Sequence, residues 1–124
     1  MILVDTSIWV DHLRRGDVGV TEALHANQVA THDFVIGELA CGHLKARGQI
    51  LALLAQLPRV AAASEPETLY FLEHRRLFGR GLGYIDVQLL AAASLRSDIH
   101  LWTRDRKLKE AAVELGVAYA EFRR

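Results

Sequence analysis

Four acidic residues each stand where an apolar run gives way to a segment with helical character. They are Asp5 in MILVDTSIWV, Glu38 in FVIGELACG, Asp86 in GLGYIDVQLLAAA and Asp105 in LWTRDRKLK. A carboxylate beside an apolar run is costly to ionise without compensation, because desolvation and neighbouring like charges both oppose ionisation. Four such groups gathered in one pocket need a divalent cation, so we expect these residues to form a metal site.

Mg²⁺ suits such a set of ligands. It prefers oxygen ligands in octahedral geometry and keeps several waters, which leaves positions for a substrate phosphate and an attacking water. A bound ion lowers the pKa of its water and neutralises charge that builds on the phosphorane oxygens. We expect Asp5 and Asp86 to bind the ion directly or through water, and Glu38 and Asp105 to complete the cage. Neighbouring hydroxyls on Thr6, Ser7 and Thr103 would orient carboxylates or metal-bound waters.

Each acid also has a simpler interpretation when it is taken alone. Asp5 and Asp105 resemble helix caps, and Glu38 resembles a solvated helix residue. Asp86 is the strongest single candidate, because it lies between Ile85 and Val87 at the start of a helix rich in Leu and Ala. The metal site is therefore predicted from the four positions together.

The acids converge only if they follow parallel strands that alternate with helices, since ligands of open α/β sheets bind beyond the carboxyl ends of the strands. The pattern predicts strands over residues 2–4, 28–31, 59–63, 99–103 and 117–119, and helices over 6–14, 21–27, 34–45, 50–57, 65–78, 84–96 and 106–115. This alternation predicts an α/β fold of three layers, with a mainly parallel sheet between helices.

Local signals predict how several of these helices begin. Thr6 and Ser7 are expected to cap the first helix, and Asp33 the helix that follows the second strand. Ser64 and Glu67 have the spacing of a capping box. The glycine-rich run 79–83 is expected to be a flexible loop near the site.

Length and composition are those of one small domain. A chain of 124 residues fits a single domain over 1–124, and its 15 basic and 15 acidic residues exclude a globally basic nucleic-acid coat. The lone Cys41 excludes an internal disulfide and is expected to be a small buried side chain. The first ten residues lack the basic start of a signal peptide, and no apolar run reaches membrane-spanning length. We expect a cytoplasmic protein with no membrane partner.

The sequence resembles a PIN domain of the VapC toxin type. The resemblance lies in VDTSIWVD at the start, an isolated Glu38 in a helix, the Asp86 motif followed by LLAAA, and LWTRDRKL around Asp105. It implies a Mg²⁺- or Mn²⁺-dependent endoribonuclease, with the four acids on the family's acidic positions. It also implies a VapB-like antitoxin that blocks the site, and a homodimer. Flanking arginines, at Arg80, Arg104 and Arg106, would then hold RNA phosphates.

An apolar helical hairpin over residues 34–57 is the predicted antitoxin surface. Its second helix has more aliphatic side chains than one core-facing side needs, at Ile50, Leu51, Leu53, Leu54 and Leu57. Together with the resemblance, this predicts that an antitoxin segment packs here and sends a basic side chain into the acidic pocket.

Other classes of small acidic α/β proteins fit less well. A phosphoacceptor receiver module needs an aspartate at the end of a central strand, and residues 59–63 have none. An aspartyl-phosphate phosphatase needs a second acid two residues after Asp5, where Ser7 stands. A PIN-like binding module without catalysis is a further alternative, although all four acids are present.

Overall fold

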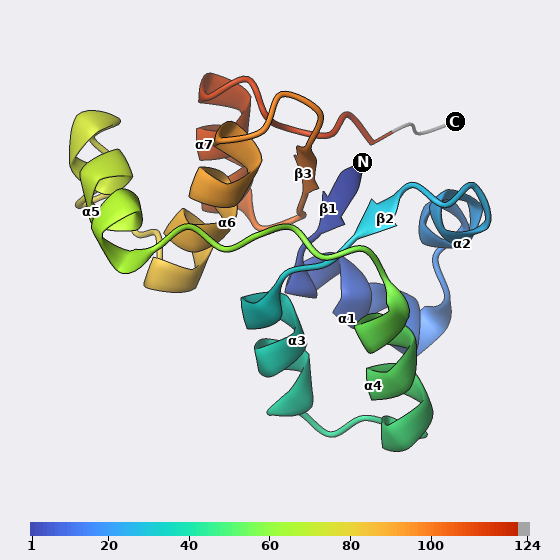
Figure 1. Cartoon of the computed structure of the whole chain (residues 1–124). Helices are drawn as coiled ribbons and strands as arrows, with labels where there is room; N and C mark the ends of the chain where they lie inside the picture. The colour runs from blue at the N-terminus through green and yellow to red at the C-terminus, as the bar shows by residue number, and fades with distance from the viewer. Residues whose placement is uncertain (122–124) are drawn as a thin grey trace.

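A short parallel sheet lies at the centre of the computed structural model, which describes residues 1–121 (Figure 1). The strands are β1 (Ile2–Val4), β2 (Val29–Ala30) and β3 (His100–Trp102), in the order β2-β1-β3. Leu3 of β1 pairs with Ala30 on one side and with Leu101 on the other. The α/β fold with a parallel sheet is confirmed.

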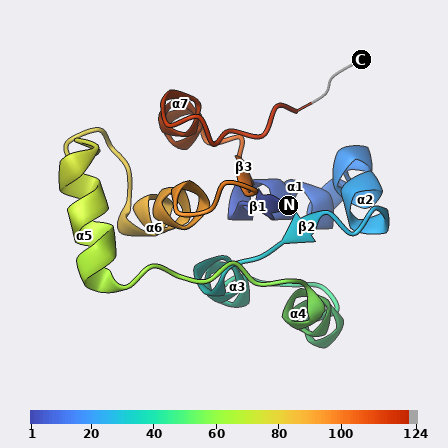
Figure 2. The same ribbon diagram turned by 45° about the horizontal axis from the view of Figure 1, so that its top comes forward.

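Helices surround the three strands. They are α1 (Thr6–Arg15), α2 (Val18–His25), α3 (Asp33–Ala40), α4 (Arg47–Gln56), α5 (Glu65–His74), α6 (Tyr84–Ser94) and α7 (Arg106–Glu114). Figure 2 shows α7 on one side of the strands and α3 and α4 on the other. α6 packs against β3, and α5 packs against α6 at the outer edge. Among residues 1–121, no helix combines the length and apolar character that crossing a membrane requires.

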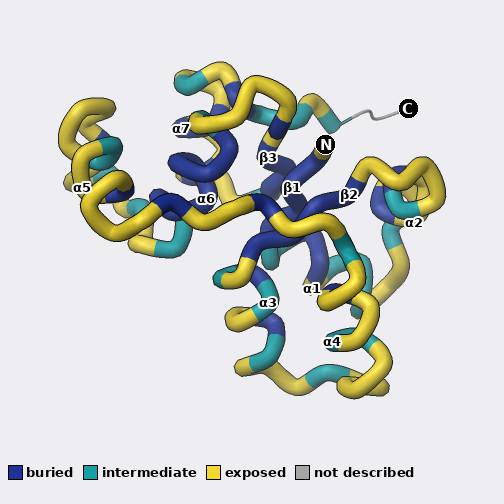
Figure 3. The backbone as a smooth tube through the Cα atoms, in the orientation of Figure 1, coloured by how far each residue is buried: buried dark blue, intermediate teal, exposed yellow. Residues whose placement is uncertain are grey.

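The core is built from the strands and α6. Every residue of β1 is buried, and so is every residue of α6 from Val87 to Ala93 (Figure 3). This explains why α6 reads as apolar on all sides, because a helix surrounded by other elements has no solvent face. By contrast, α4 buries fully only Leu54, and α5 only Thr68.

Two of the five predicted strands are wrong as strands. The stretch 59–63 pairs only at Arg59, which bridges to Thr31, and the chain then leaves the sheet edge to reach α5 (Figure 1). The stretch 117–119 likewise forms a single bridge, from Ala118 to Leu101. Both have strand-like residues, but extended pairing depends on a neighbour that stays alongside.

The caps are partly as predicted. Ser64 and Glu67 form the predicted capping box, with both reciprocal hydrogen bonds present. The other two are wrong by one position. Asp5 is the N-cap residue of α1, without a side-chain cap bond. His32 caps α3 by accepting the Phe34 N–H on Nδ1.

Two helices end earlier than predicted. α3 stops at Ala40, so Cys41 lies outside the packed face and is exposed, contrary to the expected burial. α5 stops at His74, and Arg76 then has a positive φ of 54°. A left-handed residue ends a helix, since non-glycine residues adopt it rarely and not in series.

Candidate active site

The strand ends bring two of the four acids to one edge of the sheet. Asp5 directly follows β1, and Asp105 follows β3 after two residues. Because β1 and β3 are parallel neighbours, both acids emerge beyond the carboxyl ends of their strands. Helices supply the others, with Glu38 in α3 and Asp86 in the first turn of α6.

Asp5 is buried, with 6% of its surface exposed, and two hydroxyl groups hold one of its oxygens. The Ser7 and Thr103 hydroxyls both donate to Asp5 Oδ2, at 2.8 and 2.7 Å. Each hydroxyl in turn accepts a backbone N–H: Ser7 that of Arg104 and Thr103 that of Asp105. These two relays fix the orientation of the Asp5 carboxylate, since a donor that is itself polarised makes a stronger bond.

Glu38 is tied to the same region through Thr6. The Thr6 hydroxyl donates to Glu38 Oε1 at 2.7 Å, which joins α3 to the first residue of α1. Glu38 is exposed and Thr6 is half-buried. This contact brings Glu38 next to the residue that follows Asp5 in the chain.

The environment of Asp86 raises the pKa of its carboxyl group. Its Oδ2 accepts the Gly83 N–H at 3.0 Å, which forms the first turn of α6. Burial, together with repulsion from Asp5 and Asp105, raises the pKa of Asp86 above its usual value despite that hydrogen bond. The repulsion from two acids of other elements means that Asp5, Asp86 and Asp105 lie close enough to interact.

In each of the four carboxylates, one oxygen accepts hydrogen bonds from the described part of the chain and the other does not. Hydrogen bonds reach Asp5 Oδ2, Glu38 Oε1, Asp86 Oδ2 and Asp105 Oδ1. Within residues 1–121 the second oxygen of each carboxylate accepts none. Four oxygens are thus left over around a region of repelling charge, and a hard cation binds through such atoms.

The spacing of the acids bears on which cation fits. Among the described residues, no three His, Cys, Asp or Glu side chains lie near enough to one another to hold an ion as a closed cage. Mg²⁺ is usually bound by one or two carboxylates and keeps several waters. An all-oxygen set with this spacing therefore fits a hydrated Mg²⁺ or Mn²⁺ ion, with some carboxylates acting through water.

The three predicted phosphate-binding arginines already have carboxylate partners. Arg80 makes a two-pronged pair with Glu114 of α7, at 2.8 and 2.9 Å. Arg104 is held by three carboxylates and is the least available of the three. Arg106 is exposed and only loosely paired, with Glu110 at 3.6 Å. Arg106 therefore has the weakest carboxylate pairing of the three, and RNA contacts by Arg80, Arg104 and Arg106 stay a prediction.

Lys107 is a cation near the site that sequence reasoning missed. Its side chain lies across Gly81, where a Cβ would come within 2.9 Å of Lys107 Cδ and still closer to Nζ. Gly81 also has φ +79°, a backbone conformation that favours glycine in the loop that leads to Asp86. Within residues 1–121, Lys107 has no carboxylate partner. Its position two residues after Asp105 was the signal that could have found it.

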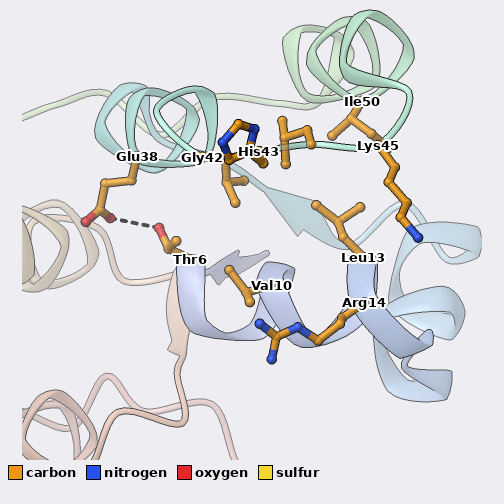
Figure 4. Close-up of a pocket in the computed structure, with 11 residues that line it drawn as sticks. Thr6, Val10, Leu13, Arg14, Glu38, Gly42, His43, Lys45 and Ile50 are labelled. Atoms are coloured by element: carbon orange, nitrogen blue, oxygen red, sulfur yellow. Dashed lines mark hydrogen bonds between the residues drawn. The ribbon is translucent and has the colours of Figure 1, made fainter.

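A pocket of about 480 Å³ opens beside Glu38 (Figure 4). It lies between α1, which contributes Thr6, Val10 and Leu13, and the segment from α3 to α4. The Thr6 to Glu38 hydrogen bond closes the end near the acids. The pocket has mainly apolar walls with Glu38 at one end, and the basic side chains of Arg14, His43 and Lys45 also line it.

The predicted apolar hairpin is less exposed than expected. Leu54 is fully buried, and Ile50, Leu51 and Leu57 pack against the core, which leaves Leu53 exposed at 40%. The open apolar surface is therefore the pocket between α1 and the α3–α4 segment, to which Ile50 contributes.

With this geometry established, comparison with known proteins decides the family. The PIN domain family model matches residues 2–114. The chain belongs to the PIN-domain family. Two curated proteins called Ribonuclease VapC32, from Mycobacterium tuberculosis strains CDC 1551 / Oshkosh and ATCC 25618 / H37Rv, are each 46% identical over 121 residues. The match covers 98% of this chain and 98% of each relative, which makes the chain a VapC-type PIN protein.

A solved structure independently agrees with the fold. The crystal structure of PAE2754 from Pyrobaculum aerophilum superposes with a TM-score of 0.64 and 18% sequence identity. The likeness covers 93% of this chain and 94% of that chain. At such low identity it supports the architecture alone.

Proposed function

We propose that this VapC-type protein is a metal-dependent endoribonuclease, the toxin of a type II toxin–antitoxin module. The proposal is carried by three carboxylates, those of Asp5, Asp86 and Asp105, which lie close enough for repulsion to help raise the pKa of Asp86. Each of them keeps one oxygen to which no residue in the described part of the chain donates a hydrogen bond. A purely structural site would not leave repelling carboxylates without a cation. The 46% identity to proteins called ribonucleases supports the reaction class.

Asp5 and Asp86 would hold Mg²⁺ or Mn²⁺, with Glu38 and Asp105 acting directly or through water. When bound, the ion supplies an activated water and neutralises the charge that develops on the scissile phosphate. Ser7 and Thr103 keep Asp5 Oδ2 occupied, so Oδ1 is the atom presented to the ion. Thr6 donates a hydrogen bond to Glu38 Oε1 in the same way, so Oε2 would be the Glu38 oxygen that faces the ion.

The RNA backbone would be held by cations on the α7 side of the site. Lys107 and Arg106 lie at the start of α7, directly after Asp105. The Lys107 side chain lies against Gly81, so its ammonium is near the loop that leads to Asp86. A positive charge held beside an acidic site offsets the repulsion between the carboxylates and an approaching phosphate.

The partner would be a cognate VapB-like antitoxin seated in the pocket beside Glu38. The apolar walls from Val10, Leu13 and Ile50 suit one face of an amphipathic helix. A basic side chain on that segment would reach Glu38 at the end of the pocket. Such a contact would neutralise part of the acidic cluster and compete with the metal.

A homodimer is the proposed assembly, as the VapC relationship suggests. An exposed apolar surface between α5 and α6 supports it, with Tyr70 exposed at 69% and Leu95 at 62% around one pocket. Light scattering after gel filtration measures the mass directly. A monomer at all concentrations tested would exclude this assembly.

The central experiment is RNA cleavage by the purified protein with Mg²⁺, with Mn²⁺ and with EDTA, with Asp5→Asn as the control. Mapping the cleavage ends in total RNA after induced expression identifies the substrate class. We expect metal-dependent internal cuts from the wild type only. Binding of an antitoxin without any cleavage would favour the binding-module alternative, and labelling by acetyl phosphate would favour a receiver-like domain.

A further inference from the structure

Arg104 is surrounded by carboxylates from three separate segments of the chain. Its guanidinium donates to Asp11 of α1 at 2.8 Å, to Asp17 before α2 at 2.7 Å, and to Glu121 beyond the last helix. Its Cζ atom also lies 5.9 Å from the centre of the Trp102 ring. The guanidinium of arginine keeps its positive charge in proteins, so the carboxylates always have this charge between them.

The backbone of the same residue reaches the proposed metal site. The Arg104 N–H donates to Ser7 Oγ at 3.2 Å, and Ser7 donates to Asp5 Oδ2. The residue before it, Thr103, donates to the same oxygen. Arg104 thus joins a surface cluster of charges to the two hydroxyls that orient Asp5.

These contacts fix the β3–α7 turn against α1 at two points. Ser7 and Asp11 are four residues apart, so they lie on one face of α1, a turn from each other. Arg104 binds the first through its backbone and the second through its side chain. A turn held at two points on a helix cannot rotate about either one.

We propose that Arg104 is a positioning residue for the metal site. Its clamp on Asp11, Asp17 and Glu121 holds Ser7 and Thr103 on Asp5 Oδ2, and this leaves Asp5 Oδ1 directed to the ion. The inference rests on the proposed function, because it concerns the affinity of that same site for metal. It also replaces the predicted role of Arg104 as a contact to RNA.

The charges favour the clamp over a phosphate contact. Asp11 also pairs with Arg15 at 3.5 Å, so three carboxylates and two guanidiniums leave the cluster with one net negative charge, which repels a phosphate. Without Arg104, the three carboxylates would repel one another and separate α1 from the segments before α2 and after Tyr119. Lysine offers no planar fork, so it cannot bind several carboxylates in fixed directions.

The test is Mn²⁺ binding, followed by EPR of the free ion with each folded variant well below its melting temperature. Arg104→Gln is expected to bind Mn²⁺ at least about 10-fold more weakly, as is typical when a group that orients a metal ligand is lost. Arg104→Lys should fall between Arg104→Gln and the wild type. Ser64→Ala, which removes the α5 capping box, is the control for lost stability and should leave Mn²⁺ affinity unchanged.

A double-mutant cycle tests whether Arg104 affects Mn²⁺ binding through the hydroxyl groups that hold Asp5. Thr103→Val removes one hydroxyl from Asp5 at almost constant volume, and Arg104→Gln should weaken Mn²⁺ binding much less in that background. Full additivity would overturn the inference, as would wild-type affinity in a folded Arg104→Gln or Arg104→Lys variant. If the wild type and Asp5→Asn bind Mn²⁺ equally, the proposed metal site itself fails.

Discussion

Replacing Asp86 by asparagine tests whether the acids repel one another in the folded protein. Asn keeps an oxygen that can accept the Gly83 N–H, so the first turn of α6 can retain its hydrogen bond. The substitution removes the negative charge that burial and repulsion from Asp5 and Asp105 disfavour. The substitution therefore has two opposite effects on the free energy of unfolding. It removes a charge that favours the first turn of the helix, and it removes a charge that burial and repulsion disfavour.

The direction of the pKa shift decides which effect is larger. A charge in the first turn of a helix stabilises it by about 0.3–1 kcal/mol, and this favours Asp. The pKa of Asp86 is nevertheless raised, so burial and repulsion outweigh the favourable terms in the folded state. The charge of Asp86 therefore lowers the free energy of unfolding at neutral pH. In a domain of this size, each 1 kcal/mol of difference between the two proteins changes the melting temperature by about 3–6 °C.

The pH dependence has a definite sign. Below the ordinary value of 3.8 the carboxyl is protonated in folded and unfolded chains, and the variant and the wild type should melt together. As pH rises through the raised folded pKa, the wild type must ionise Asp86 in the fold, and its stability falls relative to the variant. At neutral pH in EDTA, Asp86→Asn is therefore the more stable protein.

Calorimetry in EDTA from about pH 3 to about pH 8 measures this difference. Added Mg²⁺ or Mn²⁺ gives the second half of the test. Metal should stabilise the wild type more than the variant, by up to about 2.7 kcal/mol at 100 times the dissociation constant. Asp33→Asn is the matched control, because Asp33 is also in a first helical turn but pairs with Arg59 at 3.0 Å. It should gain no stability. A destabilised Asp86→Asn, with equal metal effects on both proteins, would make Asp86 a plain cap.

Three further predictions concern the reaction and its partners. Asp5→Asn should abolish metal-dependent RNA cleavage with an unchanged circular dichroism spectrum, and a folded, active variant would remove Asp5 from the site. In that inactive background, Lys107→Gln should weaken RNA binding severalfold in fluorescence anisotropy and reduce the salt slope by about 0.7, while Arg80→Gln should not, because Arg80 is paired with Glu114. Val10→Glu places a charge in the pocket beside Glu38 and should weaken antitoxin binding at least about 10-fold by titration calorimetry, with RNA cleavage retained.

The elements that sequence predicted well are those whose signals are local. The apolar run 2–4 and the apolar helix 84–96 are correct in type because burial on all sides selects their residues. The capping box at Ser64 depends on four consecutive residues and is also correct. The stretch 59–63 failed because a strand requires a partner, and the chain turns away from Thr31 after one bridge.

In the site too, some contacts could be predicted from sequence patterns and others depend on the folded chain. Asp5 and Asp105 could be placed together from the parallel arrangement of the strands that precede them. The partners of Arg104 could not, because Asp11 and Asp17 are 93 and 87 residues away in the sequence. Lys107 stands two residues after Asp105, which could have indicated a cation near the site, but its approach to Gly81 depends on the folded chain.

The turn between β3 and α7 is where the stability of the fold and the chemistry of the site meet. Its three consecutive residues have different partners: Thr103 binds Asp5, Arg104 binds the surface carboxylates, and Asp105 repels Asp86. Repulsion among the site acids pushes this turn away from α6 when no cation is present, whereas the Arg104 contacts hold it against α1. On the proposed function, the clamp would oppose the repulsion among the acids and would keep the acidic site assembled before an ion binds.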